Sequence, residues 1–235
     1  MDNIRLNKFN KTALLVGAHE LVGRKLLIQL LRSEAYEKIV LLLEEPLNFQ
    51  HPKLEVHQIS FERLPKWQHL FSVDDVFYCW NSQMKIKHKG LKYDAKQTYA
   101  YELAELCSAA KVHQYFFLSS IAADANNVLY FRHQKVEIEK AITDISFWAI
   151  HFFRPGPLID DDKSTRSMRF FKNITERVNQ MTDGNLSKYK PVSATKVAMA
   201  MVGSAQAFQP GIHIYSAEYL HEFSNNEEGL TNYEG

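Results

Sequence analysis

The stretch from Lys11 to Leu31 constrains the fold more than any other part of the chain. It opens with a short apolar run, Ala13–Val16, which has the length of one buried β-strand. A turn follows from Gly17 to Gly23, and after it leucines recur at helical spacing up to Leu31. A buried strand joined by a tight turn to an amphipathic helix is the opening of a βαβ unit. We therefore expect a parallel sheet with helices packed against it.

The glycines of this turn suit a nucleotide phosphate, with one exception. In βαβ units that bind dinucleotides, the first glycine allows a sharp bend and the last allows close packing of helix on strand. A middle glycine lets the pyrophosphate approach the backbone at the helix N-terminus. Gly17 and Gly23 occupy the outer positions here, but Glu20 occupies the middle one. The sequence thus keeps the turn and lacks its most phosphate-specific residue.

The rest of the chain alternates predicted strands and helices. We predict further strands at 38–43, 54–59, 74–80, 112–118, 148–153 and 212–215, and further helices at 99–110, 128–142, 168–180 and 192–207. Such alternation predicts an α/β fold, a Rossmann-like doubly wound parallel sheet with helices on both faces and a small C-terminal substrate-side region.

A single domain accounts for all 235 residues. We divide residues 1–235 into a dinucleotide-binding core at 11–153, a substrate-side segment with the late helix and strand at 154–222, and a tail at 223–235. We find no internal repeat, low-complexity tract or long linker that would indicate a second domain.

Composition argues against several classes of function. The chain has 28 Lys and Arg against 27 Asp and Glu, so no overall charge directs it to nucleic acid. Cys79 and Cys107 are its only cysteines, which is typical of a reducing compartment and too few for a zinc tetrad. Asp160–Asp162 lacks EF-hand spacing, so we expect no metal site. With no signal-peptide core and no apolar run near the roughly 20 residues that span a bilayer, we expect a cytoplasmic protein without a membrane partner.

Residues that follow the predicted strands should share one crevice. In an open parallel sheet the ligand binds beyond the carboxyl ends of the strands. The crevice should therefore hold the glycine turn, Glu44, Asn81 and Ser119–Ser120. Glu44 lies about 20 residues after Gly23, where a carboxylate accepts hydrogen bonds from the adenosine ribose and repels a 2′-phosphate. This position favours NAD over NADP; the alternative is that Glu44 is a solvated glutamate at a strand end.

Five segments together resemble those of the atypical short-chain dehydrogenases/reductases. They are LLVGAHELVGRKLL, YFFLSSIAADAN, VLYFRHQKVEIEKAI, FFRPGPLI and KPVSATKVAMAMV, in the family's order and spacing. The chain is most similar to the Tat-interacting-protein-like and NAD(P)-binding oxidoreductases of that superfamily, from Thr12 to Val202. The resemblance implies NAD or NADP bound by Gly17, Ala18, Glu20, Leu21, Val22, Gly23, Glu44, Asn81, Lys135, Pro155 and Gly156.

The same resemblance implies a serine, a tyrosine and a lysine as catalytic residues. In the family the serine orients the substrate oxygen, the tyrosine transfers the proton, and the lysine lowers the pKa of the tyrosine and holds the nicotinamide ribose. Ser120, with Ser119 as the alternative, matches the serine, and Lys135 matches the lysine. The residue four positions before Lys135 is Phe131, whose ring carries no titratable proton.

Tyr130 is the candidate substitute for the missing tyrosine. On a regular helix, residues four apart lie about 40° from alignment, whereas residues five apart lie about 140° apart. Tyr130 and Lys135 are five apart, so Tyr130 reaches the site only if the first helical turn is irregular or bulged.

Two hypotheses follow for function. The first is an NAD(P)-dependent oxidoreductase of unknown substrate, with Ser120, Tyr130 and Lys135 in a site whose glycine turn and proton-donor position are degenerate. The second is a catalytically inactive Rossmann-fold protein that acts as a dinucleotide or metabolite sensor or as a scaffold for a protein partner. A basic segment at 85–96 is either a phosphate-facing loop or a solvated one. It lacks the aromatic ladder that stacks bases, which disfavours nucleic acid as a partner.

Overall fold

The computed structural model describes residues 9–80, 94–119, 128–161 and 191–223, with the backbone alone for 128–134. These residues form a seven-stranded parallel sheet in the order β3-β2-β1-β4-β5-β6-β9. The strands are β1 (Lys11–Val16), β2 (Tyr36–Leu43), β3 (Leu54–Gln58), β4 (Asp75–Tyr78), β5 (Gln114–Leu118), β6 (Ala149–Phe153) and β9 (Gly211–Tyr215). Strand β1 pairs with both β2 and β4, so the strand order reverses there. The predicted doubly wound sheet is confirmed.

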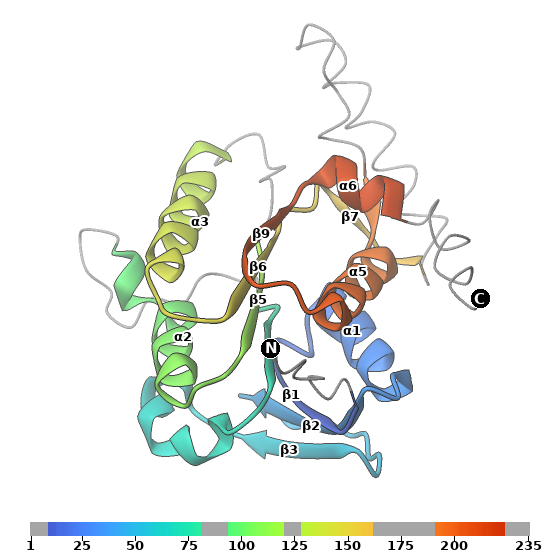
Figure 1. Cartoon of the computed structure of the whole chain (residues 1–235), viewed down its shortest axis with the longest axis vertical. Helices are drawn as coiled ribbons and strands as arrows, with labels where there is room; N and C mark the ends of the chain where they lie inside the picture. The colour runs from blue at the N-terminus through green and yellow to red at the C-terminus, as the bar shows by residue number, and fades with distance from the viewer. Residues whose placement is uncertain (1–8, 81–93, 120–127, 162–190, 224–235) are drawn as a thin grey trace, which may run out of the picture.

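Helices cover both faces of the sheet (Figure 1). On one face lie α1 (Leu21–Arg32), α5 (Ala194–Ala207) and α6 (Ala217–Glu222), and on the other lie the 3₁₀ helix η1 (Phe61–Phe71), α2 (Tyr99–Ala109) and α3 (Val128–Thr143). Side chains alternate between the two faces along each strand. In β4, Val76 and Tyr78 belong to the core under α2 and α3, and Phe77 belongs to the core under α1 and α5. Burial on both faces explains why the five central strands, from β2 to β6 in the sheet order, are largely apolar.

Some elements were not predicted, and each lacks a long periodic pattern. Helix η1 contains Pro65, which interrupts helical spacing, and a 3₁₀ helix puts side chains at a different period from an α-helix. Strands β7 (Leu158–Ile159) and β8 (Val192–Ser193) pair in a separate sheet and are too short to show alternation. Helix α6 spans six residues and the 3₁₀ turn η2 (Ala95–Gln97) three. The helix predicted at 168–180 lies outside the described residues.

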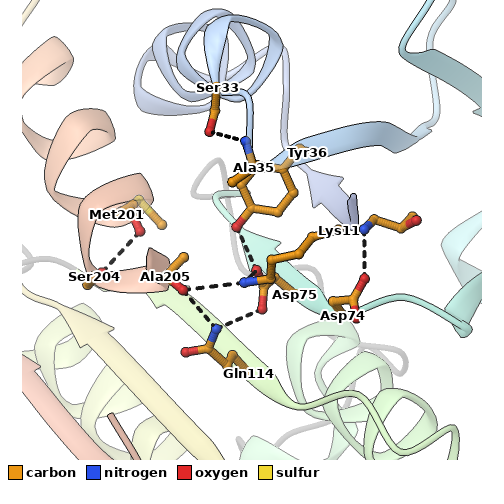
Figure 2. A network of polar contacts seen from close by, with 11 residues as sticks. Lys11, Ser33, Ala35, Tyr36, Asp74, Asp75, Gln114, Met201, Ser204 and Ala205 are labelled. Atoms are coloured by element: carbon orange, nitrogen blue, oxygen red, sulfur yellow. Dashed lines mark hydrogen bonds and ion pairs between the residues drawn. The ribbon is translucent and has the colours of Figure 1, made fainter. Parts of the chain in front are cut away.

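A buried polar network joins the amino ends of the strands (Figure 2). Lys11 begins β1 and forms an ion pair with Asp75 at the start of β4; the two side chains are 5% and 0% exposed. The Tyr36 hydroxyl donates to Asp75 Oδ2 at 2.6 Å, and Gln114 Nε2 donates to Asp75 Oδ1 at 2.9 Å. Lys11 Nζ and Gln114 Nε2 also donate to the carbonyl of Ala205, near the end of α5. Burial raises the pKa of Asp75, and the Lys11 charge opposes this rise.

Candidate functional site

A cavity of about 360 Å³ opens beyond the carboxyl ends of β1, β2 and β4. Its lining comes from the end of β1 and the following turn, from the end of β2, and from two aromatic residues. The lining residues are Val16, Gly17, His19, Glu20, Leu42, Leu43, Glu44, Glu45, Phe61 and Trp80. Because the strand order reverses at β1, this is the switch point at which doubly wound sheets bind ligands. The structure thus brings together Gly17, Glu20 and Glu44, three of the residues proposed to bind cofactor.

The two glycines of the turn are required by the packing of the protein itself. Gly17 has a φ of +88°, and a Cβ there would lie 2.5 Å from the backbone nitrogen of Trp80. A Cβ on Gly23 would lie 1.9 Å from the carbonyl oxygen of Gly17. The N–H of Glu20 donates to that same carbonyl at 2.9 Å and closes the turn. Both glycines hold α1 against the strand ends, whichever ligand the cavity accepts.

Glu20 occupies its position in the turn without backbone strain. Its φ of −74° and ψ of 159° are ordinary extended values for any L-residue. It is the N-cap residue of α1, although its side chain makes no capping hydrogen bond. Burial raises the pKa of Tyr78, and the charges of Glu20 and Glu44 raise it further. The two carboxylates therefore act on the same end of β4 from two sides of the cavity.

The other predicted residues of the turn serve the core. Ala18 and Val22 are buried, and Leu21 is half-buried against the same cluster under α1. Their side chains pack among protein atoms, so the turn can offer a ligand mainly its backbone and the side chains of His19 and Glu20. Pro155 and Gly156, also predicted to bind the cofactor, are buried and follow Arg154 after the end of β6.

Lys135 is buried on α3 with 7% of its surface exposed. Burial lowers its pKa to about 8, and the negative charges of Glu139 and, more weakly, Glu20 oppose this decrease. Lys135 therefore responds to a carboxylate on its own helix and to the one in the glycine turn. Because the lowered pKa is near neutrality, the ammonium is mostly protonated at pH 7 and mostly neutral at pH 9.

A bidentate ion pair links α3 to the end of β6. Arg154, the residue after β6, donates from Nε to Glu139 Oε2 at 3.0 Å and to Oε1 at 3.2 Å, and Nη2 also contacts Oε2. The Glu139 side chain is 5% exposed and lies one helical turn after Lys135. Two parallel hydrogen bonds to one carboxylate fix direction as well as distance. This pair holds the Lys135 helix next to the Pro155–Gly156 segment, and no sequence pattern indicated it.

Phe61 and Trp80 form an aromatic wall of the cavity. Their ring centroids are 4.5 Å apart, and Trp80 also stacks on Tyr99 with centroids 6.1 Å apart and an interplanar angle of 5°. Such a wall suits a planar ring or a cation. Trp80 directly precedes Asn81 at a predicted strand end, which is a weak signal. No sequence signal indicated that Phe61 belongs to the site, because η1 was not predicted.

Several of the predicted site residues lie outside the part of the chain that the structure describes. Asn81, Ser120 and most of the basic segment are outside the described residues, and the side chains of Tyr130 and Phe131 are too. Ser119 is described; it is buried, and its N–H donates to the carbonyl of Phe153 at 2.7 Å. The arrangement of the serine and tyrosine around Lys135 stays a prediction.

Neither a metal site nor a membrane helix is found in the described part of the chain. No three His, Cys, Asp or Glu side chains there are grouped to hold a metal ion. Asp160 lies 3.6 Å from Lys25 Nζ, and Asp161 accepts hydrogen bonds from the Ser193 hydroxyl and the Thr195 N–H. No helix among these residues is long and apolar enough to cross a membrane.

A parallel sheet that reverses order at β1, with a cavity beneath a glycine turn at that point, defines a Rossmann-like α/β fold. No protein-family model matches the chain. Protein HTATIP2 of Rattus norvegicus is 26% identical over 176 residues, covering 71% of this chain and 73% of that protein. Protein FMP52, mitochondrial, of Debaryomyces hansenii is 22% identical over 205 residues, covering 85% and 88%.

Solved structures share the fold at low sequence identity. The Bordetella bronchiseptica enzyme WbmH in complex with NAD+ has a TM-score of 0.60 and 13% identity, over 94% of this chain and 82% of that one. A mutated uronate dehydrogenase has a TM-score of 0.58 and 15% identity, over 88% and 74%. The chain is thus similar in sequence to HTATIP2 and FMP52, and it shares the Rossmann-like fold of these solved structures.

Proposed function

We propose that the chain is an NAD(P)-dependent oxidoreductase, with NAD preferred, whose substrate is a small molecule of unknown identity. The observation that carries the proposal is the buried Lys135, which lies on the helix that the family uses and responds to the charge of the glycine turn. WbmH, a structural neighbour, binds NAD+, and another neighbour is a uronate dehydrogenase. These similarities support the proposal for this chain.

The residues that line the cavity fit the adenosine end of a dinucleotide in shape but oppose its pyrophosphate in charge. The turn keeps both structural glycines, and Glu44 lines the cavity directly after β2, where a carboxylate would hold the adenosine ribose. The Glu20 carboxylate, if about 4 Å from a phosphate charge, repels it by about 1 to 4 kcal/mol at an effective dielectric of 80 to 20. That repulsion weakens binding by about tenfold to a thousandfold. We therefore expect dinucleotide binding in the micromolar range, weaker than an intact turn provides.

Each residue then has a defined task. A bound nicotinamide cofactor would supply hydride chemistry. The turn backbone and Glu44 would hold its adenosine end, and protonated Lys135 would donate hydrogen bonds to the nicotinamide ribose. The Arg154–Glu139 pair positions Lys135 by fixing its helix. Ser120 is the expected contact for the substrate oxygen, and Tyr130 is the candidate proton donor.

The affinity for NADH is expected to fall about fivefold between pH 7 and pH 9. Lys135 has its pKa lowered to about 8, so raising the pH removes its positive charge and converts charge-assisted hydrogen bonds into weaker neutral ones. Nicotinamide fluorescence titrations at pH 7, 8 and 9 measure the change. Lys135→Met should bind NADH weakly and with the same affinity throughout. Equal affinity of the unaltered protein at pH 7 and pH 9 would remove Lys135 from the cofactor site.

Phe131→Tyr is expected to raise NADH-dependent carbonyl reduction by at least about a hundredfold, because general acid catalysis contributes about that much. The change restores a phenol four residues before Lys135, at about 40° from alignment with it. Consumption of NADH is followed with a panel of aldehydes, ketones and quinones. The double variant Phe131→Tyr/Lys135→Met serves as the control and should lose the gain. Equal inactivity before and after the substitution would count against the oxidoreductase function.

Two sequence positions favour the second candidate, an inactive dinucleotide or metabolite sensor or a scaffold for a protein partner. The position that carries the proton donor in the family is Phe131, and the position that meets the pyrophosphate is Glu20. A protein that binds NADH tightly, reduces no carbonyl in the panel and gains nothing from Phe131→Tyr would support the sensor.

A further inference from the structure

We propose that the cavity between Glu20 and Glu44 also accepts an adenosine-type nucleoside with a positively charged 5′ substituent, and that this ligand competes with the dinucleotide. The inference rests on the proposed function, because it uses the adenosine end of the same crevice. It adds a second class of ligand, selected by charge at the position where a pyrophosphate would lie.

The shape of the cavity defines the nucleoside part of the ligand. Its volume of about 360 Å³ is at the small end of the range for ligand pockets, which suits one nucleoside better than a whole dinucleotide. Trp80 and Phe61 provide an aromatic wall, and Leu42 and Leu43 provide apolar surface beside it. A purine fits such a lining. Glu44 directly follows β2, where a carboxylate holds ribose hydroxyls in dinucleotide-binding members of this fold.

The charges of the lining define the 5′ substituent. Glu20, Glu44 and Glu45 contribute three carboxylates, and His19 is the only basic side chain among the described lining residues. Lys135 is close enough to respond to Glu20 but is not part of this lining. The cavity is therefore predominantly anionic along its described surface.

Glu20 holds the decisive position among these carboxylates. It is the N-cap residue of the twelve-residue helix α1, whose N-terminus in this fold would otherwise face a ligand phosphate. Here the chain places its own negative charge at that helix end, where it is favourable. A ligand phosphate meets a like charge, while a ligand ammonium meets an opposite one. The same Coulomb interaction that weakens a phosphate at least about tenfold should strengthen an ammonium by a similar factor.

Three nucleosides that differ only at the 5′ position test this charge selection. They are 5′-amino-5′-deoxyadenosine, whose alkyl amine is protonated at pH 7, neutral adenosine, and dianionic AMP. Isothermal calorimetry on the full chain should rank them in that order, with steps of about tenfold. The amino compound should also displace NADH, seen as loss of bound-nicotinamide fluorescence.

Two matched variants separate charge from shape. Glu20→Gln keeps the size of the side chain and removes its charge, so the three affinities should converge to within about threefold. Glu37→Gln makes the same change at an exposed position near the start of β2 and should leave the ranking unaltered. Both variants should fold, which a cooperative thermal unfolding transition shows, and Glu20→Gln should unfold at a slightly lower temperature because it removes a favourable charge from the N-terminus of α1.

The possible outcomes distinguish failure of this inference from failure of the proposed oxidoreductase function on which it rests. AMP binding as tightly as the amino compound, or a ranking that Glu20→Gln leaves unchanged, overturns the inference. If NADH binds but the amino compound does not displace it, the inference fails and the oxidoreductase proposal stands. If neither NADH nor any of the three nucleosides binds, both fail together.

Discussion

Asp75→Ala is expected to lower the free energy of unfolding by about 3 to 5 kcal/mol. The substitution leaves the Lys11 ammonium buried without its carboxylate, and it removes the acceptor of hydrogen bonds from Tyr36 and Gln114. Urea denaturation followed by tryptophan fluorescence measures the loss, and an unchanged slope with urea shows that stability alone has changed. The network joins four strands and α5, so the whole sheet should lose stability together (Figure 2).

Two controls show whether burial is the cause. The double variant Lys11→Met/Asp75→Leu removes both charges and should recover part of the lost stability, because a buried ion pair gains little over apolar residues of similar volume. The remaining loss reflects the hydrogen bonds from Tyr36 and Gln114, which leucine does not restore. Glu137→Ala breaks an exposed ion pair, in which Glu137 lies 3.0 Å from Lys140, and should cost less than about 1 kcal/mol. A loss below about 1 kcal/mol for Asp75→Ala itself would show that the network does not hold the strands.

Gly23→Ala is expected to destabilise the protein by about 3 kcal/mol and to abolish dinucleotide binding. The added Cβ would lie 1.9 Å from the carbonyl oxygen of Gly17, a backbone atom that cannot swing aside. The turn must open to relieve the overlap, which moves the start of α1 away from the strand ends. Urea denaturation and NADH titration of the same preparation measure the two effects.

Gly203→Ala is the matched control for that substitution. Gly203 lies inside α5, and its added Cβ would have Phe223 Cζ as the nearest atom at 3.5 Å, an ordinary contact. Alanine is favoured over glycine inside a helix, so this change should stabilise the protein by about 0.5 to 1 kcal/mol. If both substitutions left the free energy of unfolding unchanged, that result would contradict the close packing described for the turn.

The local periodicity of apolar residues predicted most of the fold. The apolar run at Ala13–Val16 and the leucines after it identify β1 and α1, and repeated alternation of strands and helices gives the parallel sheet. The Lys11–Asp75 and Arg154–Glu139 pairs could not be foreseen, because each joins residues far apart in the chain or on different elements without a shared period. Helix η1 was not predicted for a local reason: a 3₁₀ helix has a shorter period than an α-helix, and Pro65 interrupts the pattern.

The candidate site was foreseen in outline. Strand ends in a doubly wound sheet predict that Gly17, Glu20 and Glu44 meet, and the cavity does bring them together. The sequence showed that Glu20 replaces the middle glycine of the turn. The structure adds that the backbone of Glu20 is unstrained there. The aromatic wall of Phe61 and Trp80 depends on tertiary packing between segments that carry no common motif.

Direct titration of the purified chain with NADH and with NADPH tests the central claim, that the crevice at β1 and β2 is a dinucleotide site. Nicotinamide fluorescence or calorimetry at pH 7 serves both ligands. We expect micromolar affinity for NADH and weaker affinity for NADPH, because a carboxylate at the position of Glu44 would accept hydrogen bonds from ribose hydroxyls and repel a 2′-phosphate. Failure of both to bind at millimolar concentration would contradict the account and remove dinucleotide chemistry from this crevice.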